Sequence, residues 1–236
     1  MSEESKAIEE VAKTTGKAID VAGQVGGFIA PLIKGSLEQG IGIFEDKLKY
    51  MRWERQIRLI ERAKEFMKEN GLDEVSRPLP LKFAVPLLQG ASLEDDDYLQ
   101  DMWAKLLVNS VNNQSVELKR VYIDILERLS PLEGRILEKI YGLPFNEIQH
   151  AGLVAYQLPQ NVTIEKEGTD YPKLDNLEVE LALINLARVG CISPTRTWGG
   201  GEVYSTIHPT LLGKYFLDAC TIKKLNERNN FFTVDK

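Results

Sequence analysis

The most regular pattern of apolar and polar positions lies between residues 44 and 70. Apolar side chains recur there every three to four residues among charged ones: Phe44, Leu48, Met51, Trp53, Ile57, Ile60, Ala63 and Met67. This spacing places them along one face of a helix. Gly71 follows, and glycine commonly ends helices because it adopts a positive φ without steric cost. The pattern predicts a helix over residues 44–70, and a weaker stripe of small apolar residues predicts another over residues 3–22.

The next stretch predicts an interruption and then a group of shorter helices. Residues 72–90 contain Pro78, Pro80 and Pro86, which predict a break in the helical run. Ser92, followed by the acidic residues 94–97, predicts an N-cap and the acidic first turn of a new helix. Apolar periodicity predicts a further helix over residues 118–129. Ser130-Pro131-Leu132-Glu133 then has the residues of a capping box, which predicts another helix start.

The C-terminal third predicts a mixture of helix and strand. Residues 142–172 predict a short helix near residues 146–153 and a short strand near 161–165. A helix ending at Gly190 follows, with an apolar face made of Leu174, Leu177, Leu181, Ile184 and Leu186. Gly199-Gly200-Gly201 separates two β-prone runs, residues 192–198 and 202–207, which is typical of a hairpin. A last helix is predicted from about Pro209.

Together these patterns predict a mainly α protein with three parts. Residues 1–71 form N-terminal Gly-rich and charged long helices, and residues 72–145 form a central helical bundle. Residues 146–236 form a winged-helix-like α+β unit with a two-stranded hairpin, because a helix, a two-stranded wing and a helix follow one another there.

Glycine is concentrated near the N-terminus. Seven of the 18 glycines fall within residues 16–42, and Gly23 and Gly27 have a spacing that permits close approach of two helices. One interpretation is a helical hairpin that is either flexible or closely packed. The other is a segment that contacts a membrane or a partner, or that self-associates, for which the candidate residues are Gly23, Gly26, Gly27, Phe28 and Ile29.

Composition bears on the compartment and on the partners. The first ten residues are acidic where a secretory signal is basic, and no run of 18 apolar residues occurs. Cys191 and Cys220 are a single pair in a chain of 236 residues, which is not a disulfide framework. We therefore expect a cytoplasmic protein, with peripheral contact to a membrane surface as a further expectation. Self-association and a protein partner are also open at this stage.

The charge argues against nucleic acid as a partner. The whole chain has a net charge of -6. Residues 150–236 contain nine basic and ten acidic residues, so this stretch has a net charge of -1. Arg188 and Arg196 are the candidate nucleic-acid contacts, but Glu178 and Glu180 lie on the same predicted helix as Arg188 and would repel phosphate. A structural or protein-binding wing is favoured over one that reads DNA.

The sequence contains none of the short motifs that identify common chemistries. It has no phosphate-binding glycine loop, no dinucleotide-binding motif, no zinc-protease motif and no nucleophile elbow. Neither His150 nor His208 accompanies a nucleophile in such a context, and Cys191 is interpreted as a small buried apolar residue. The acidic residues 94–97 lack the spacing of a calcium loop and are interpreted as helix caps. We expect no catalytic residues, no metal and no cofactor, and therefore no enzyme.

Two stretches carry a family resemblance. They are RPLPLKFAVPLLQGASLEDDDYLQDMWAKLLVNSVN, which begins at Arg77, and YIDILERLSPLEGRILEKIY, which begins at Tyr122. Their pattern resembles the abortive-infection alpha family of bacterial proteins, carried here by Pro86, residues 95–97, Leu99, Trp103, Ala104, Leu106, Leu107, Ile125, Leu129, Ser130 and Pro131. The family's closing pattern is approximated by Leu183, Leu186, Gly190, Ile192, Leu212, Gly213 and Phe216. The resemblance implies a role in defence against phage, by stopping or killing the infected cell.

Three hypotheses about function remain open. The first is a non-enzymatic phage-defence protein that acts through a membrane or a partner, and it predicts that removing residues 1–43 abolishes toxicity. The second is a winged-helix regulator that binds nucleic acid, with salt-dependent binding that weakens when Arg188 and Arg196 are replaced. The third is an unrecognised hydrolase, in which replacing His208 or a buried acid abolishes function without unfolding the protein.

Overall fold

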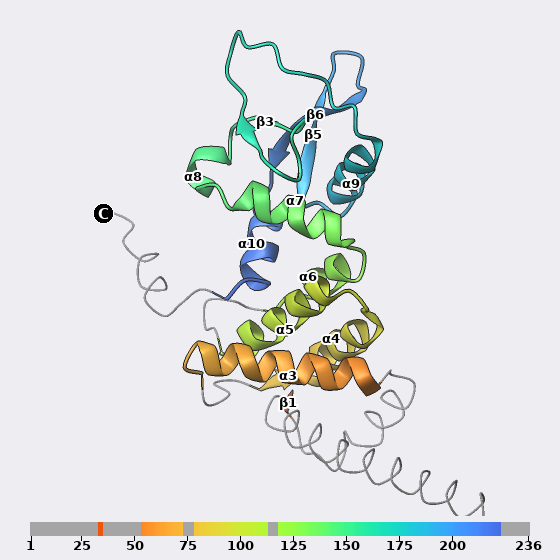
Figure 1. The fold of residues 1–236 in the computed structure, drawn as a ribbon, viewed down its shortest axis with the longest axis vertical. Coiled ribbons are helices and arrows are strands. Elements are labelled where there is room, and N and C mark those ends of the chain that lie inside the picture. Colours follow the sequence, from red (N-terminus) through yellow and green to blue (C-terminus); the bar gives the residue numbers. More distant parts are fainter. Residues whose placement is uncertain (1–32, 35–52, 73–77, 113–117, 223–236) are drawn as a thin grey trace, which may run out of the picture. The chain divides into compact units, whose positions relative to one another are not determined.

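The protein is helix-rich and carries one small antiparallel sheet. A computed structural model describes residues 33–34, 53–72, 78–112 and 118–222, and these ranges contain eight helices (Figure 1). The chain divides into two compact units. Unit 1 comprises residues 1–95 and 107–117, and unit 2 comprises residues 96–106 and 118–236. The prediction of a mainly α protein with a small β component is confirmed.

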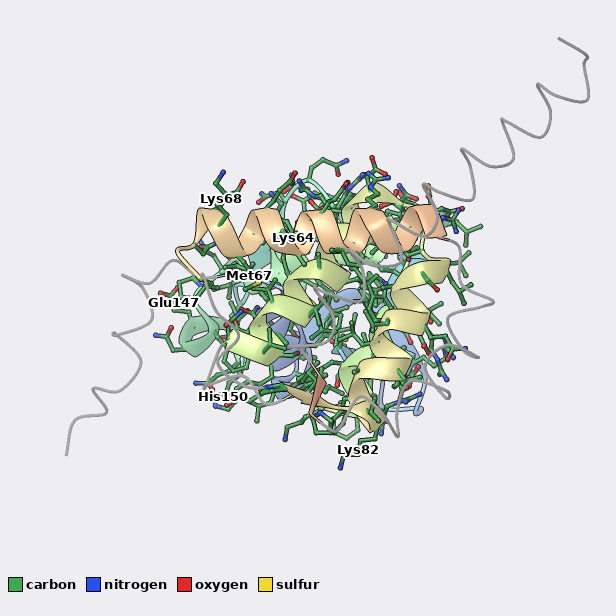
Figure 2. The ribbon with its side chains drawn as sticks, turned by 90° about the horizontal axis from the view of Figure 1, so that it is seen from below. Lys64, Met67, Lys68, Lys82, Glu147 and His150 are labelled. Atoms are coloured by element: carbon green, nitrogen blue, oxygen red, sulfur yellow. The ribbon has the colours of Figure 1, made fainter. Side chains whose placement is uncertain are left out.

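Helix α3, Trp53–Glu69, is the longest described element of unit 1. It forms for the predicted reason, since Leu59, Ile60, Ala63 and Met67 are buried along one face. In Figure 2 Lys68 projects away from the helix, while Met67 lies on the buried side. Gly71 ends the helix at a φ of 64°, and Leu72 N–H donates to the Met67 carbonyl at 2.8 Å. The prediction for residues 44–52 lies outside the described residues.

The break predicted from the prolines is wrong over its second half. Residues 81–93 form α4, Leu81–Leu93, with Pro86 inside it, and α4 packs against α3. A proline within a helix removes one backbone hydrogen bond. The helix forms because Ala84, Leu87, Leu88 and Ala91 are buried, and this apolar contact offsets the missing bond. Strand β2, Leu79–Pro80, precedes α4 and pairs in parallel with β1, Ile33–Lys34. Strand β1 lies in the glycine-rich stretch, for which a helical hairpin was one of the two interpretations.

The helix that was predicted to begin at Ser92 begins four residues later. Ser92 is buried in the last turn of α4, where its hydroxyl donates to the Gln89 carbonyl at 2.7 Å. Asp96 caps the next helix instead, because its Oδ1 accepts from the N–H groups of Tyr98 and Leu99 at 3.0 and 3.1 Å. That helix is α5, Asp97–Asn112, which contributes residues to both units. The capping interpretation of the acidic cluster is therefore correct for Asp96.

Unit 2 begins its own series of helices after residue 117. Helix α6 spans Arg120–Leu126, and α7 spans Pro131–Tyr141. The capping box predicted at α7 is present: Glu133 N–H donates to Ser130 Oγ at 3.3 Å, and Ser130 N–H donates to Glu133 Oε2 at 2.6 Å. A short helix, α8, Phe145–Ile148, follows. It ends earlier than predicted, because Leu153 and Val154 belong to a strand.

The sheet of unit 2 has four antiparallel strands in the order β4-β3-β6-β5. Their bounds are β3, Leu153–Val154; β4, Thr163–Ile164; β5, Ile192–Arg196; and β6, Glu202–Pro209. The strand predicted near residues 161–165 and the hairpin around Gly199–Gly201 are both confirmed. Helix α9, Leu177–Arg188, packs against α7 and against the β5–β6 hairpin (Figure 1).

The last helix within the described residues, α10, Leu211–Ala219, is joined to α7 by one buried tyrosine. Tyr141 Oη donates to the Cys191 carbonyl at 2.5 Å and accepts from Thr210 N–H at 2.9 Å. Thr210 caps α10, since its Oγ1 accepts from Gly213 N–H at 3.0 Å. Gly213 lies directly against the Cys191 carbonyl and the Tyr141 hydroxyl, where a Cβ would collide with both. This site therefore requires glycine.

Candidate interaction surface on helix α9

Helix α9 has well-defined ends. Asn176 caps it, with Oδ1 accepting from the N–H groups of Glu178 and Val179 at 3.1 and 3.2 Å. Gly190 ends it at a φ of 79°, and Cys191 N–H donates back to the Leu186 carbonyl at 2.9 Å. These caps fix where the helix begins and ends, and its contacts with α7 and the hairpin fix which side chains face inward.

The apolar face that the sequence indicated for this helix is largely exposed. The buried side chains of α9 are Val179, Ala182, Leu183 and Leu186. Leu177, Leu181 and Ile184 are 67%, 56% and 41% exposed. Of the apolar face predicted from the sequence, Leu186 is the one α9 residue that is buried. The helix is apolar on two sides. The side that contains Val179, Leu183 and Leu186 packs against α7 and the hairpin, and the side that contains Leu177, Leu181 and Ile184 faces outward.

The exposed apolar residues form a continuous stripe that ends in a positive charge. Residues 177, 181, 184 and 188 succeed one another at intervals of four, three and four, which places them on one face of the helix. We refer to Leu177, Leu181, Ile184 and Arg188 as the α9 surface. An exposed apolar stripe on a helix is typical of an interaction site.

A hydrogen-bond network holds Arg188 at its end of the stripe. Arg188 Nε and one terminal nitrogen donate to Asn185 Oδ1 at 3.1 and 2.6 Å. Asn185 Nδ2 donates to the Arg128 carbonyl at 3.0 Å and to Glu133 Oε1 at 2.7 Å. Glu133 is 5% exposed and is itself part of the α7 capping box. The guanidinium is thus fixed through Asn185 to the start of α7.

Another exposed apolar side chain, Trp198, lies at the tip of the β5–β6 hairpin. Trp198 is fully exposed in the turn, whose ends are joined by a hydrogen bond of 2.9 Å from Thr197 N–H to the Gly201 carbonyl. Gly200 has a φ of 81°, which an L side chain rarely adopts. Arg196, the other candidate nucleic-acid contact, is exposed and pairs in register with Glu202. The structure thus places an acidic residue opposite Arg196 across the hairpin.

The two histidines and two cysteines considered for chemistry occupy different environments. His208 Nε2 is 3.1 Å from Thr195 Oγ1, and its Nδ1 is 3.3 Å from the Ala151 carbonyl. Cys191 is completely buried, as predicted, and burial together with the nearby Glu133 carboxylate raises the pKa of its thiol to about 12. Burial also raises the pKa of the Cys220 thiol. Protonated thiols are poor nucleophiles. His150 is exposed after α8 (Figure 2).

Two further observations concern metals and membranes. Among the residues that the structure describes, no group of three or more His, Cys, Asp or Glu side chains is arranged to hold a metal ion. In the same part of the chain, no helix combines the length and the apolar character needed to cross a bilayer. The N-terminal candidates Gly23, Gly26, Gly27, Phe28 and Ile29 lie outside the described residues.

Comparison with known proteins gives one match. The model of a family described as abortive infection alpha matches residues 54–220. This range includes α9 and the hairpin, and it begins after the glycine-rich segment. No curated protein and no solved structure matches the chain.

Proposed function

The chain belongs to the abortive infection alpha family, and we propose on that premise that it is a non-enzymatic phage-defence protein that acts by binding a protein partner through the α9 surface. Membership of the family supports the general role, in which an infected bacterium stops growing or dies before it releases phage. The manner of action, binding rather than catalysis, is our proposal.

The exposure of Leu177, Leu181 and Ile184 is the observation that carries the proposal. Full burial of a large aliphatic side chain contributes about 1.5–3 kcal/mol of transfer free energy, and these three side chains, still about half exposed, forgo part of it. A binding partner would recover that free energy. The residues are held on a capped helix, so the surface exists before a partner arrives and little ordering is required on binding.

The topology around α9 supports a winged-helix-like unit. Helix α7, strand β3, helix α9 and the hairpin β5–β6 follow in that order, and β6 lies between β3 and β5 in the sheet. In DNA-binding proteins with helix-based recognition, the equivalent helix presents polar and basic side chains to the major groove. Helix α9 instead presents leucine, isoleucine and glutamate outward, with Arg188 at its end. This composition favours protein over nucleic acid as the partner.

Replacement of Leu181 by glutamate provides the test. The L181E variant places a charge in the middle of the stripe, at a side chain that is 56% exposed, so the fold should tolerate it. The matched control is L211E, since Leu211 is 61% exposed in the first turn of α10 and lies outside the α9 surface. Both variants and the original chain are expressed in a bacterial host and challenged with a panel of phages.

The outcomes distinguish action through the α9 surface from action through the N-terminal segment. We expect the original chain and L211E to reduce plaque formation and L181E to lose protection while remaining folded. Protection by L181E equal to that of L211E would overturn the α9 proposal. A chain lacking residues 1–43 belongs in the same experiment, because loss of protection in it alone would assign the action to the glycine-rich segment, which is the membrane hypothesis.

A further inference from the structure

Arg188 ends the α9 surface at the C-terminal end of the helix, and the acidic Glu178 borders it at the other end. Glu178 lies in the first turn of α9 and is exposed, and Arg188 is the last residue of the helix and is also exposed. Leu181 and Ile184 lie between them. Glu178 and Arg188 are ten positions apart, which corresponds to about 15 Å along the helix at about 1.5 Å per residue. Leu177, Leu181, Ile184 and Arg188 lie on one face of the helix, whereas Glu178 lies about 100° around the helix from Leu177, at the edge of that face.

Such a surface is complementary to itself when turned end to end. We propose that two copies of the chain pair through their α9 surfaces, with the two helices antiparallel and related by a two-fold axis. The proposal rests on the proposed function in one respect, that the α9 surface is a binding surface, and it names a second copy of this chain as the partner.

The two-fold operation gives each group a suitable neighbour. With the axis passing between residues 181 and 184, Leu181 of one copy faces Ile184 of the other, so the apolar centres cover one another. Arg188 of one copy then lies beside Leu177 and Glu178 of the other. The methylene groups of an arginine can cover a leucine while its guanidinium reaches a carboxylate, which suits this pair of neighbours.

The arginine is already held in place for this contact. Asn185 Oδ1 accepts two hydrogen bonds from Arg188, and Asn185 is itself bonded to Glu133 and to the Arg128 carbonyl. A side chain whose position is fixed beforehand loses less conformational entropy on binding. A parallel pairing would bring Arg188 next to Arg188, so the charge at the end of the stripe favours the antiparallel arrangement.

The contact area sets the strength that we expect. A pair of 12-residue helices covers less surface than the roughly 1,200–2,000 Å² buried in a stable complex of standard size, so the dimer should dissociate on dilution. Because each interface includes two Arg–Glu contacts at its edge, dissociation should also increase with salt.

Charge reversal at both ends gives a sharp test. R188E creates two Glu–Glu contacts and E178R creates two Arg–Arg contacts in the antiparallel pair, so each variant alone should dimerise at least about tenfold more weakly than the original chain. An equimolar mixture of R188E and E178R replaces every repulsive contact by an attractive one, and the mixture should form a heterodimer. A variant that had lost its fold would not associate after mixing. Association restored by mixing therefore shows that the weak dimers of the single variants are due to charge and not to unfolding.

The measurement is the molar mass of the full-length chain by light scattering over a range of concentrations. The control is E167R, which makes the same charge change at an exposed residue away from α9 and should leave the dimer unchanged. A monomeric original chain, dimers that persist in both R188E and E178R, or a mixture that stays monomeric would each overturn the pairing.

Failure of this proposal is distinguishable from failure of the proposed function. If the original chain is monomeric but L181E loses phage protection, the α9 surface binds another protein and self-pairing is wrong. If R188E abolishes the dimer and L181E still protects, self-pairing is right and the α9 surface is not the route of defence.

Discussion

Asn185 Nδ2 lies 2.7 Å from Oε1 of Glu133, and this hydrogen bond joins the outward side of α9 to the buried start of α7. The same carboxylate closes the capping box of α7 through its other oxygen. The same amide holds Arg188 through Oδ1. One pair of residues therefore stabilises a helix start, the packing of two helices and the position of a charge on the α9 surface.

Removal of the amide should destabilise the protein. N185A leaves a carboxylate oxygen of Glu133 without its partner in a site that is 5% exposed, and an unsatisfied buried acceptor costs about 1–3 kcal/mol. We expect the free energy of unfolding, measured by urea denaturation, to fall by about 2 kcal/mol. R188A is the matched control, since Arg188 is exposed, and it should change stability by less than about 0.5 kcal/mol. Equal losses in the two variants would contradict a structural role for the Asn185–Glu133 bond.

Gly213 should not tolerate even a methyl group. The Cβ of G213A would collide with the backbone carbonyl of Cys191 and the hydroxyl of Tyr141, and the carbonyl is held by the surrounding hydrogen bonds. Overpacking of this kind costs about 3 kcal/mol, so thermal denaturation should show a much lower midpoint or no cooperative transition. In G199A the added methyl meets no atom within 4 Å, and its midpoint should match that of the original chain.

Stability should fall at alkaline pH because buried groups, among them Cys191 and Tyr141, must remain protonated. Burial raises the pKa of Cys191 from 9.0 to about 12, and it raises that of Tyr141 from 10.0 to about 12. The unfolded chain ionises near the ordinary values, whereas the folded chain does not, so the unfolded state gains stability from deprotonation. The stabilising contribution is complete below pH 9 and is lost progressively as pH rises from 9 to 12.

Urea denaturation at pH 8, 9.5 and 10.5 would measure this loss. The variant C191A lacks one of the two groups and should lose less stability over the same interval than the original chain does. A free energy of unfolding that is constant or rises between pH 8 and 10.5 would be inconsistent with buried, protonated Cys191 and Tyr141.

The sequence predicted most accurately those features, such as helix caps and hairpin turns, that depend on residues close together in the chain. The capping box at Ser130 and Glu133 was correct because both partners lie within one helical turn of each other. The hairpin at Gly199–Gly201 was correct for a similar local reason. The predicted start of α5 was wrong because Ser92 and Asp96 are both good N-caps. Ser92 is buried at the end of α4, so Asp96 caps α5 instead.

The α9 surface was missed because it depends on contacts between distant segments. The sequence showed a helix with apolar residues on two sides, and spacing alone could not decide which side faces α7 and the hairpin. The sequence did contain one signal, which is that α9 has more apolar residues than one buried face requires. Val179, Leu183 and Leu186 already supply a buried face. Leu177, Leu181 and Ile184 are additional to it. Pro86 was misjudged for a related reason, since tertiary packing of α4 outweighed a local rule.

Nucleic acid should bind weakly or not at all. Helix α9 presents an apolar and acidic surface, and Arg196 lies opposite Glu202, so few phosphate contacts are available. Fluorescence anisotropy with duplex DNA at 50 and 200 mM salt should show little binding and a shallow salt dependence. R188A and R196A should change little. Tight binding that weakens steeply with salt, and further in these variants, would support the nucleic-acid hypothesis instead.

The central claim is that the chain stops phage production at the expense of the infected cell, by means of the α9 surface. The most direct test is a one-step phage growth experiment at high multiplicity, in which released phage and surviving cells are counted in the same cultures expressing the original chain, L181E or L211E. We predict that the original chain and L211E release few phage while the cells fail to survive, and that L181E releases phage as the empty host does. Low phage release with surviving cells would contradict abortive infection, and low release from L181E would contradict the role of α9.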